Sequence, residues 1–158
     1  MTEDASFADG VARALRLRAL DADDLAVISA LAQDAVLSSG DMQWQKGRRR
    51  FALLLNRYRW EDGERAVRAR DHERVRSLLV VEDVLRVRSS GLPQGAGDLV
   101  LSLLSLGWEP GGDGTGTLTL TFAGDGAIAL SVEALEVLLQ DVTRPWPDPA
   151  RRAPGHDV

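Results

Sequence analysis

The sequence predicts an α+β fold. We expect a mostly antiparallel curved sheet or small sandwich of about seven to eight strands, with a helix in the N-terminal region and a C-terminal capping helix. Three observations predict it. Short segments with alternating apolar and polar residues recur along the chain, a turn motif joins two of them, and two other segments carry apolar residues at helical spacing.

The N-terminal half predicts a strand, a helix and two more strands. A short strand over residues 15–19 leads into a helix of about three turns, with Asp21 as N-cap and Asp24 at the capping-box position. Residues 36–45 predict a strand with a bulge at Gly40-Asp41. Residues 51–60, FALLLNRYRW, predict the central strand, apolar on both faces as far as Leu55, so both faces are expected to be covered.

The middle of the chain predicts three strands separated by loops. Residues 61–73 are charged without a period and predict a loop. Strands are expected over 74–81 and 84–88, joined through Glu82 and Asp83. After the loop GLPQGAGD, the continuous apolar run of residues 99–108 predicts a fully buried strand.

Residues 117–142 predict a β-hairpin closed by a helix. Apolar residues alternate with threonine in TLTLTF, Asp125-Gly126 supplies positive-φ positions for a tight turn, and AIALS predicts the second strand. From residue 132 the apolar spacing becomes helical, and Ser131 precedes it as N-cap. The apolar stripe of this helix is expected to pack on the hairpin: Leu135, Leu138, Leu139 and Val142.

One folded domain is expected over residues 13–142. Residues 1–12 predict a frayed N-terminus, and residues 143–158, with four of the chain's six prolines, predict a flexible proline-rich tail. The absence of cysteine excludes disulfides and thiolate chemistry. With an acidic N-terminus and no long apolar run, the sequence favours a soluble cytoplasmic protein that does not bind membranes.

Charge is distributed unevenly along the chain. Residues 46–88 hold Lys46 and 12 arginines against seven acids, whereas residues 98–142 hold seven acids and no basic residue. Either oppositely charged strands pair across the sheet and cancel, or the molecule presents a basic patch to an anionic partner. The candidate contact residues of such a patch are Lys46, Arg48, Arg49, Arg50, Arg57, Arg59 and Trp60.

Residues 57–60, Arg-Tyr-Arg-Trp, have two interpretations. Aromatic side chains between arginines can stack bases and hold phosphates, but they also suit a strand end whose rings keep one edge in water. Alternation places Arg57 and Arg59 on the face of Phe51, near the strand's exposed end, and the two aromatic residues on the other. We therefore expect only weak nucleic-acid binding.

His72 is the one histidine inside the expected domain, between Asp71 and Glu73. An imidazole beside carboxylates could act as a general base or metal ligand, but no nucleophile or further set of ligands accompanies it. GGDGTG at residues 111–116 contains G-x-G between two strands, without the helix that a dinucleotide site requires. We expect no catalytic residue, no cofactor and no metal.

Five segments, in this order, resemble the bacterial family known as domain of unknown function 2948: LRALDADDLAVISALAQDAVLSSGDM, RRRFALLLNRYRWE, HERVRS, LSLLSLGWEP and LTLTFAGDGAIALSVEALEVLLQD. The resemblance covers about residues 14–142, while the 61–71 loop and the tail look particular to this chain. It implies a small cytoplasmic protein with no assigned activity or cofactor, so no functional residue is carried over. At the level of fold alone, the predicted order of strands and closing helix is similar to the pleckstrin-homology-like architecture.

The first expectation for function is a non-enzymatic protein-interaction or regulatory module, whose partner is another protein bound through an edge strand or the basic face. The alternative is an RNA- or phosphate-binding module that uses the basic segment 46–59. An enzyme of unknown class ranks third, because candidate acids, bases and nucleophiles do not converge.

Overall fold

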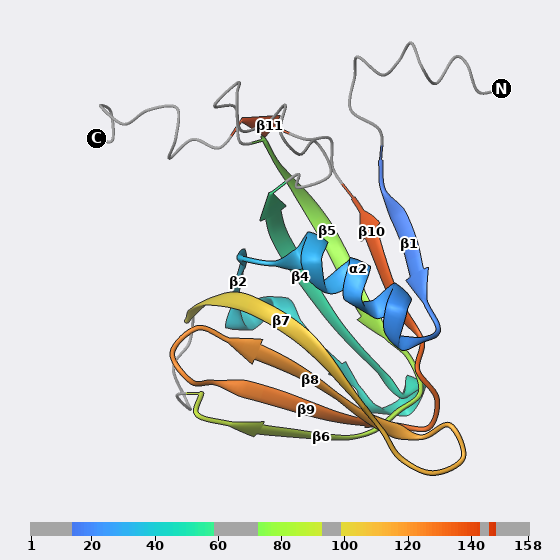
Figure 1. Ribbon diagram of the computed structural model, residues 1–158. Helices are drawn as coiled ribbons and strands as arrows, with labels where there is room; N and C mark the ends of the chain where they lie inside the picture. The colour runs from blue at the N-terminus through green and yellow to red at the C-terminus, as the bar shows by residue number, and fades with distance from the viewer. Residues whose placement is uncertain (1–13, 59–72, 93–98, 143–145, 148–158) are drawn as a thin grey trace, which may run out of the picture.

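The computed structural model describes residues 14–58, 73–92, 99–142 and 146–147, and these form one sheet and one helix (Figure 1). The helix is α2 (Ala22–Ala32), and two 3-10 turns are η1 (Ser39–Asp41) and η2 (Lys46–Arg48). The strands are β1 (Arg16–Ala19), β2 (Ala35–Ser38), β3 (Met42–Gln45), β4 (Arg50–Tyr58), β5 (Glu73–Val81), β6 (Val84–Ser90), β7 (Val100–Pro110), β8 (Gly116–Phe122), β9 (Ala127–Val132), β10 (Val137–Asp141) and β11 (Trp146–Pro147).

The sheet is antiparallel and open, with strand order β1-β10-β5-β4-β2-β7-β8-β9-β6. Two strands lie off this path, because β3 pairs with β4 and the two-residue β11 pairs with β5. Strands β2 and β3 pair one after the other with the same side of β4, and the opposite edge of β2 pairs with β7. The curved sheet is visible in Figure 1, with β1 and β6 at its ends.

Alternate residues of the strands point to one core, on the side that we call the inner face; the opposite side is the outer face. The helix α2 packs on the inner face, against β7, β1 and β4, as Figure 1 shows. The core includes Leu53 and Leu55 of β4, Leu79 of β5, Leu118 and Leu120 of β8, Leu130 of β9 and Leu139 of β10, with Leu25, Ile28 and Ala32 of α2.

The helix begins where the sequence predicts. The Asp21 carboxylate accepts a hydrogen bond from the Asp24 amide at 2.9 Å, and two aspartates occupy the first turn, where they complement the helix dipole. A second contact fixes the helix to the sheet, because the Leu106 amide donates to Ser29 Oγ at 2.9 Å. This bond lies beside the register shift between Leu103 and Ser105 in β7.

The predicted fold class is wrong. The described residues form a mostly β structure with an open sheet, and neither a sandwich nor a C-terminal capping helix is present among them. Residues 132–142 complete β9, turn at 133–136 and form β10, which inserts between β1 and β5. The apolar pattern of this segment fits both a helix and a strand, because the run is only five residues long. In the strand, Val137, Leu139 and Asp141 lie on one face, and Leu138 and Gln140 lie on the other.

Other segments differ from expectation in detail. The strand predicted over 36–45 is divided by η1, where the Ser38 side chain and Asp41 form a capping box. The run at 99–108 is a strand but not a fully buried one, since Val100 is 70% and Leu104 is 40% exposed. Strands β5 and β6 are consecutive but do not pair with each other; β6 pairs with β9.

The hairpin of residues 116–132 and the strands near 15–19, 51–58, 74–81 and 84–88 are confirmed. The hairpin turn differs by one residue from the predicted Asp125-Gly126, because the positive φ values are at Gly124 and Asp125. The predicted frayed N-terminus over residues 1–12 lies outside the described part of the chain. So does the predicted tail over residues 143–158, apart from the two residues of β11, which pair with β5. No helix in the described ranges has the length and apolar character needed to cross a membrane.

The corrected register of β10 predicts unequal effects of two neighbouring leucines. Leu139 is fully buried on the inner face, so Leu139→Ala should lower the free energy of unfolding by about 2–5 kcal/mol. Leu138 is half-buried on the outer face, so Leu138→Ala should cost about 1 kcal/mol. Urea denaturation of both variants measures the difference, and a larger loss for Leu138→Ala would contradict the strand register.

Candidate functional site

The outer face of the sheet around β4, β5 and β10 is apolar. Antiparallel sheets with one solvated face normally place polar residues on it. Here Ala52 lies opposite Val80, which lies opposite Leu138, and Leu54 lies opposite Leu78 in the next row. We call these five residues the outer apolar patch.

The patch is uncovered by the described residues. Four of its members are half-buried, and Val80, which is only 6% exposed, is enclosed between its neighbours Ala52 and Leu138. The one described helix packs on the inner face, so it cannot cover this surface. Within the described part of the chain, these apolar side chains are therefore only partly covered in the middle of the sheet.

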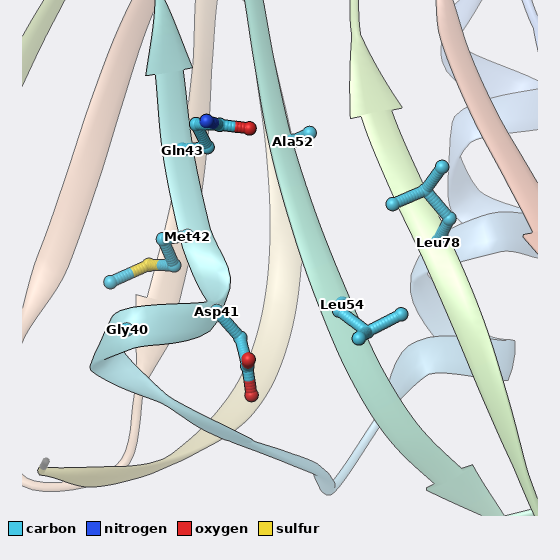
Figure 2. A pocket seen from close by; sticks show the side chains of 7 residues that line it. All are labelled: Gly40, Asp41, Met42, Gln43, Ala52, Leu54 and Leu78. Atoms are coloured by element: carbon cyan, nitrogen blue, oxygen red, sulfur yellow. The ribbon is translucent and has the colours of Figure 1, made fainter.

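A hollow of about 340 Å³ opens where the patch meets η1 and β3 (Figure 2). Its apolar part is formed by Ala52, Leu54 and Leu78, and Figure 2 shows the Leu54 side chain turned toward β5. Asp41 and Gln43 supply polar atoms at its border, and Gln43 points toward β4. The hollow is also lined by Gly40 and Met42.

Asp41 is held in place by its backbone surroundings. Its Oδ2 accepts a hydrogen bond from the Ser38 amide at 3.3 Å, while Ser38 Oγ accepts one from the Gly40 amide at 3.2 Å. These bonds fix the η1 turn that borders the hollow. The carboxylate thus has a structural partner and forms a fixed acidic border to an otherwise apolar depression.

Four arginines lie on the same outer face, and we call them the arginine rim: Arg16, Arg18, Arg74 and Arg76. Arg16 lies opposite Gln140 and Arg18 lies opposite Leu138, so both border the patch on the β1 side. None of these four arginines is among the contact residues predicted from the sequence. The sequence indicates this arrangement only through spacing: Arg16 and Arg18, like Arg74 and Arg76, are two residues apart, which places both members of each pair on one face of a strand.

The rim arginines differ in how they are held. Arg18 contacts Glu136 at 3.5 Å, with the two side chains 60% and 34% exposed. Arg74 is buried, with its guanidinium 4.4 Å from the Tyr58 ring centroid and its Nη2 donating to the Asn56 carbonyl at 2.9 Å. Arg16 is exposed and has no ion-pair partner within the described part of the chain. Arg76 is exposed on β5 and its Nε donates to Asn56 Oδ1 at 3.3 Å. Exposed positive charge therefore lies along β1 and at Arg76.

The structure separates the residues of the predicted basic patch. Lys46, Arg48, Arg49 and Arg50 share the turn between β3 and β4, where Arg49 pairs with Glu133 and Arg50 Nε donates to both Glu82 oxygens at 3.1 Å. These two ion pairs match the interpretation in which charges cancel across the sheet. Arg57 lies seven residues further along β4, about 23 Å away at strand spacing. Arg59, Trp60 and His72 lie outside the described residues.

Arg57 points into the core and forms a buried polar network. It lies on the face of Phe51, as alternation predicts, but it is fully buried and not at an exposed end. Its Nη2 donates to Asp141 Oδ1 at 2.9 Å, its Nε to Ser77 Oγ at 2.9 Å and its Nη1 to the Tyr58 carbonyl at 3.0 Å. We call this the Arg57–Asp141 network; it does not share a surface with Lys46 and Arg48.

Asp141 completes the network with two further bonds. Ser77 Oγ donates to its Oδ1 at 2.7 Å, and the Leu15 amide donates to its Oδ2 at 2.8 Å. Both carboxylate oxygens are thus occupied by partners from β4, β5 and the segment that leads into β1. Among the described residues, no group of three or more His, Asp or Glu side chains is placed to hold a metal ion.

Two substitutions test the Arg57–Asp141 network. Removing one partner of a buried ion pair leaves an uncompensated charge, so Arg57→Met or Asp141→Leu alone should cost about 3–5 kcal/mol of unfolding free energy. The double variant should cost less than either single one. Arg50→Met, at the partly exposed pair with Glu82, is the control and should cost about 1 kcal/mol or less. Equal losses for Arg50→Met and Arg57→Met in chemical denaturation would contradict this account.

Comparison with known proteins gives a family and no activity. The family model described as "Protein of unknown function (DUF2948)" matches residues 15–156, a range that also includes the 61–71 loop and most of the proline-rich segment. The matched range therefore extends past residue 142 into the proline-rich tail. No curated protein and no solved structure matches. The match spans nearly the whole sequence, and the chain belongs to the DUF2948 family of proteins of unknown function.

Proposed function

We propose that this protein is a non-enzymatic interaction module that binds another protein through the outer face of β4, β5 and β10. The observation that supports this most directly is the outer apolar patch, with its adjoining hollow and arginine rim. Contiguous apolar surface bordered by polar side chains is typical of protein–protein contact sites. Arginine is enriched at such sites, which fits the rim.

The free edges of the sheet are less suited to binding a partner strand. Strand β1 has four residues, two of them arginines. Strand β6 has a register shift between Val84 and Arg86, and Arg86 and Arg88 are exposed on it. Short length, charge and bulges are devices that prevent edge pairing, so we favour the outer face over an edge strand as the contact surface.

The same surface favours a protein partner over a nucleic acid. Its centre consists of aliphatic side chains, which neither neutralise phosphates nor stack on bases. In the basic segment, Arg49 and Arg50 are engaged in ion pairs and Arg57 is buried. We also propose that the module acts in the cytoplasm, on the basis of its cysteine-free sequence.

Site-specific photocrosslinking tests this proposal. A photoreactive residue in place of Leu54 should give a discrete protein adduct in lysate of the source organism, because this position lies at the hollow. The control places the same residue at Thr119, on the outer face of β8 and away from the patch. We expect the Leu54 adduct to survive nuclease treatment and to disappear when Leu78→Arg is added.

Two results would count against the proposal. Identical adducts from positions 54 and 119 would show that the patch has no selectivity for a partner. Loss of the Leu54 adduct on nuclease treatment would show that the contact depends on nucleic acid, and the RNA-binding alternative would then replace it.

A further inference from the structure

We infer that the outer face binds an acidic amphipathic helix of a partner protein, with an apolar side chain in the hollow and carboxylates at Arg16 and Arg18. This inference rests on the proposed function and adds the chemistry of the partner. It follows from three features of the surface: the order of its rows, the spacing between them and the position of its charge.

The rows run across the strands from an apolar end to a basic end. One row is Ala52, Val80, Leu138 and Arg18, and the next is Leu54, Leu78, Gln140 and Arg16. The hollow lies at the β4 end of both rows and the arginines lie at the β1 end. Neighbouring strands are about 4.8 Å apart, so three steps from β4 to β1 span about 14 Å.

The spacing of the rows favours a helix over an extended strand. The two rows are two residues apart along each strand, a separation of about 7 Å. An extended segment lying across the strands would cover one row, whereas a helix about 10 Å in diameter covers both. A helix needs about nine residues to span 14 Å, and its apolar positions at i, i+4 and i+7 would follow the rows.

The charge on the face selects carboxylates at the β1 end. Arg16 is exposed and without an ion-pair partner within the described ranges, and the Arg18–Glu136 contact is open to solvent and easily exchanged. Two arginines spaced two residues apart on one strand face can each make charge-assisted hydrogen bonds to a carboxylate. At the opposite end, Asp41 borders the hollow and disfavours an acidic group there.

A second copy of this chain is a poorer occupant. A symmetric contact between two outer faces uses the same patch on both subunits. With the two-fold axis along the rows, Arg16 and Arg18 of one copy would face the same arginines of the other, an arrangement of like charges that opposes association. With the axis along the strands, they would face the β4 end of the other copy, whose one carboxylate, Asp41, already accepts from the Ser38 amide. An acidic partner meets the same arginines with opposite charge.

The test is fluorescence anisotropy with the full-length protein and three labelled peptides of one length. The first is a helical peptide with leucine at i, i+4 and i+7 and three glutamates at one end. The second replaces the glutamates by glutamine, and the third replaces the leucines by serine. We expect saturable binding of the first peptide, about tenfold weaker binding of the glutamine peptide and no binding of the serine peptide.

Protein variants assign the binding to the surface. Arg16→Gln with Arg18→Gln should weaken binding of the glutamate peptide about tenfold and leave binding of the glutamine peptide unchanged. Arg86→Gln with Arg88→Gln removes the same charge from exposed positions of β6 and should have no effect. Leu54→Arg should abolish binding, and circular dichroism of this variant verifies that it remains folded.

Several outcomes would overturn the inference. Equal binding of the glutamate and glutamine peptides would refute the role of charge. Failure of all three peptides, while the Leu54 crosslink to another protein persists, would leave the proposed function and reject this partner class. Dimerisation that Leu54→Arg reverses in sedimentation would assign the face to a second copy. Peptide binding that requires removal of residues 1–13 would assign it to that segment of the chain.

Discussion

The buried ion pair between Arg57 and Asp141 joins β4 to β10 and is compatible with one arrangement of this part of the sheet. A guanidinium inside an apolar core is tolerated only where its charge and donors are matched, and Asp141, Ser77 and the Tyr58 carbonyl provide the match. Asp141 reaches this position only if residues 137–141 form a strand beside β5. The same register places Leu138 next to Val80 on the outer face. The buried pair and the outer apolar patch are therefore consequences of one strand placement.

This dependence also explains which parts of the fold the sequence predicts. The strands at 116–122 and 127–132 have a clear alternation and a turn with positive φ between them, so local pattern is sufficient. Residues 132–142 satisfy a helical spacing as well as an alternating one. The strand is formed by pairing with β1 and β5 and by contacts such as Arg57–Asp141, between residues 84 positions apart, which no local pattern contains. Tertiary pairing overrides the local preference here.

The sequence predicts only part of the candidate site, because local patterns indicate some of its features and long-range strand pairing decides the others. Residues 51–55 are apolar on both faces, which predicts that both sides of β4 are covered. The core covers the inner side, but the described residues leave the outer side only partly covered. The consecutive arginines at 48–50 predict a basic patch, but Arg49 and Arg50 form ion pairs with acidic residues of the same sheet. Arg16 and Arg76 gave no such signal, because their shared face follows from the strand order β1-β10-β5-β4. Strand order is a long-range property that short windows of sequence do not reveal.

The described residues leave the outer face of β4 and β5 open, whereas the core and α2 close the inner face. The chain contains no cysteine, so single-cysteine variants report one position each. Reaction rates with a thiol reagent should be compared for Leu54→Cys and Leu78→Cys on the outer face, and for Leu53→Cys and Leu79→Cys in the core. We expect rapid labelling of both outer positions in the isolated native protein and strong protection of both core positions. Protection of Leu54→Cys equal to that of Leu53→Cys would contradict it.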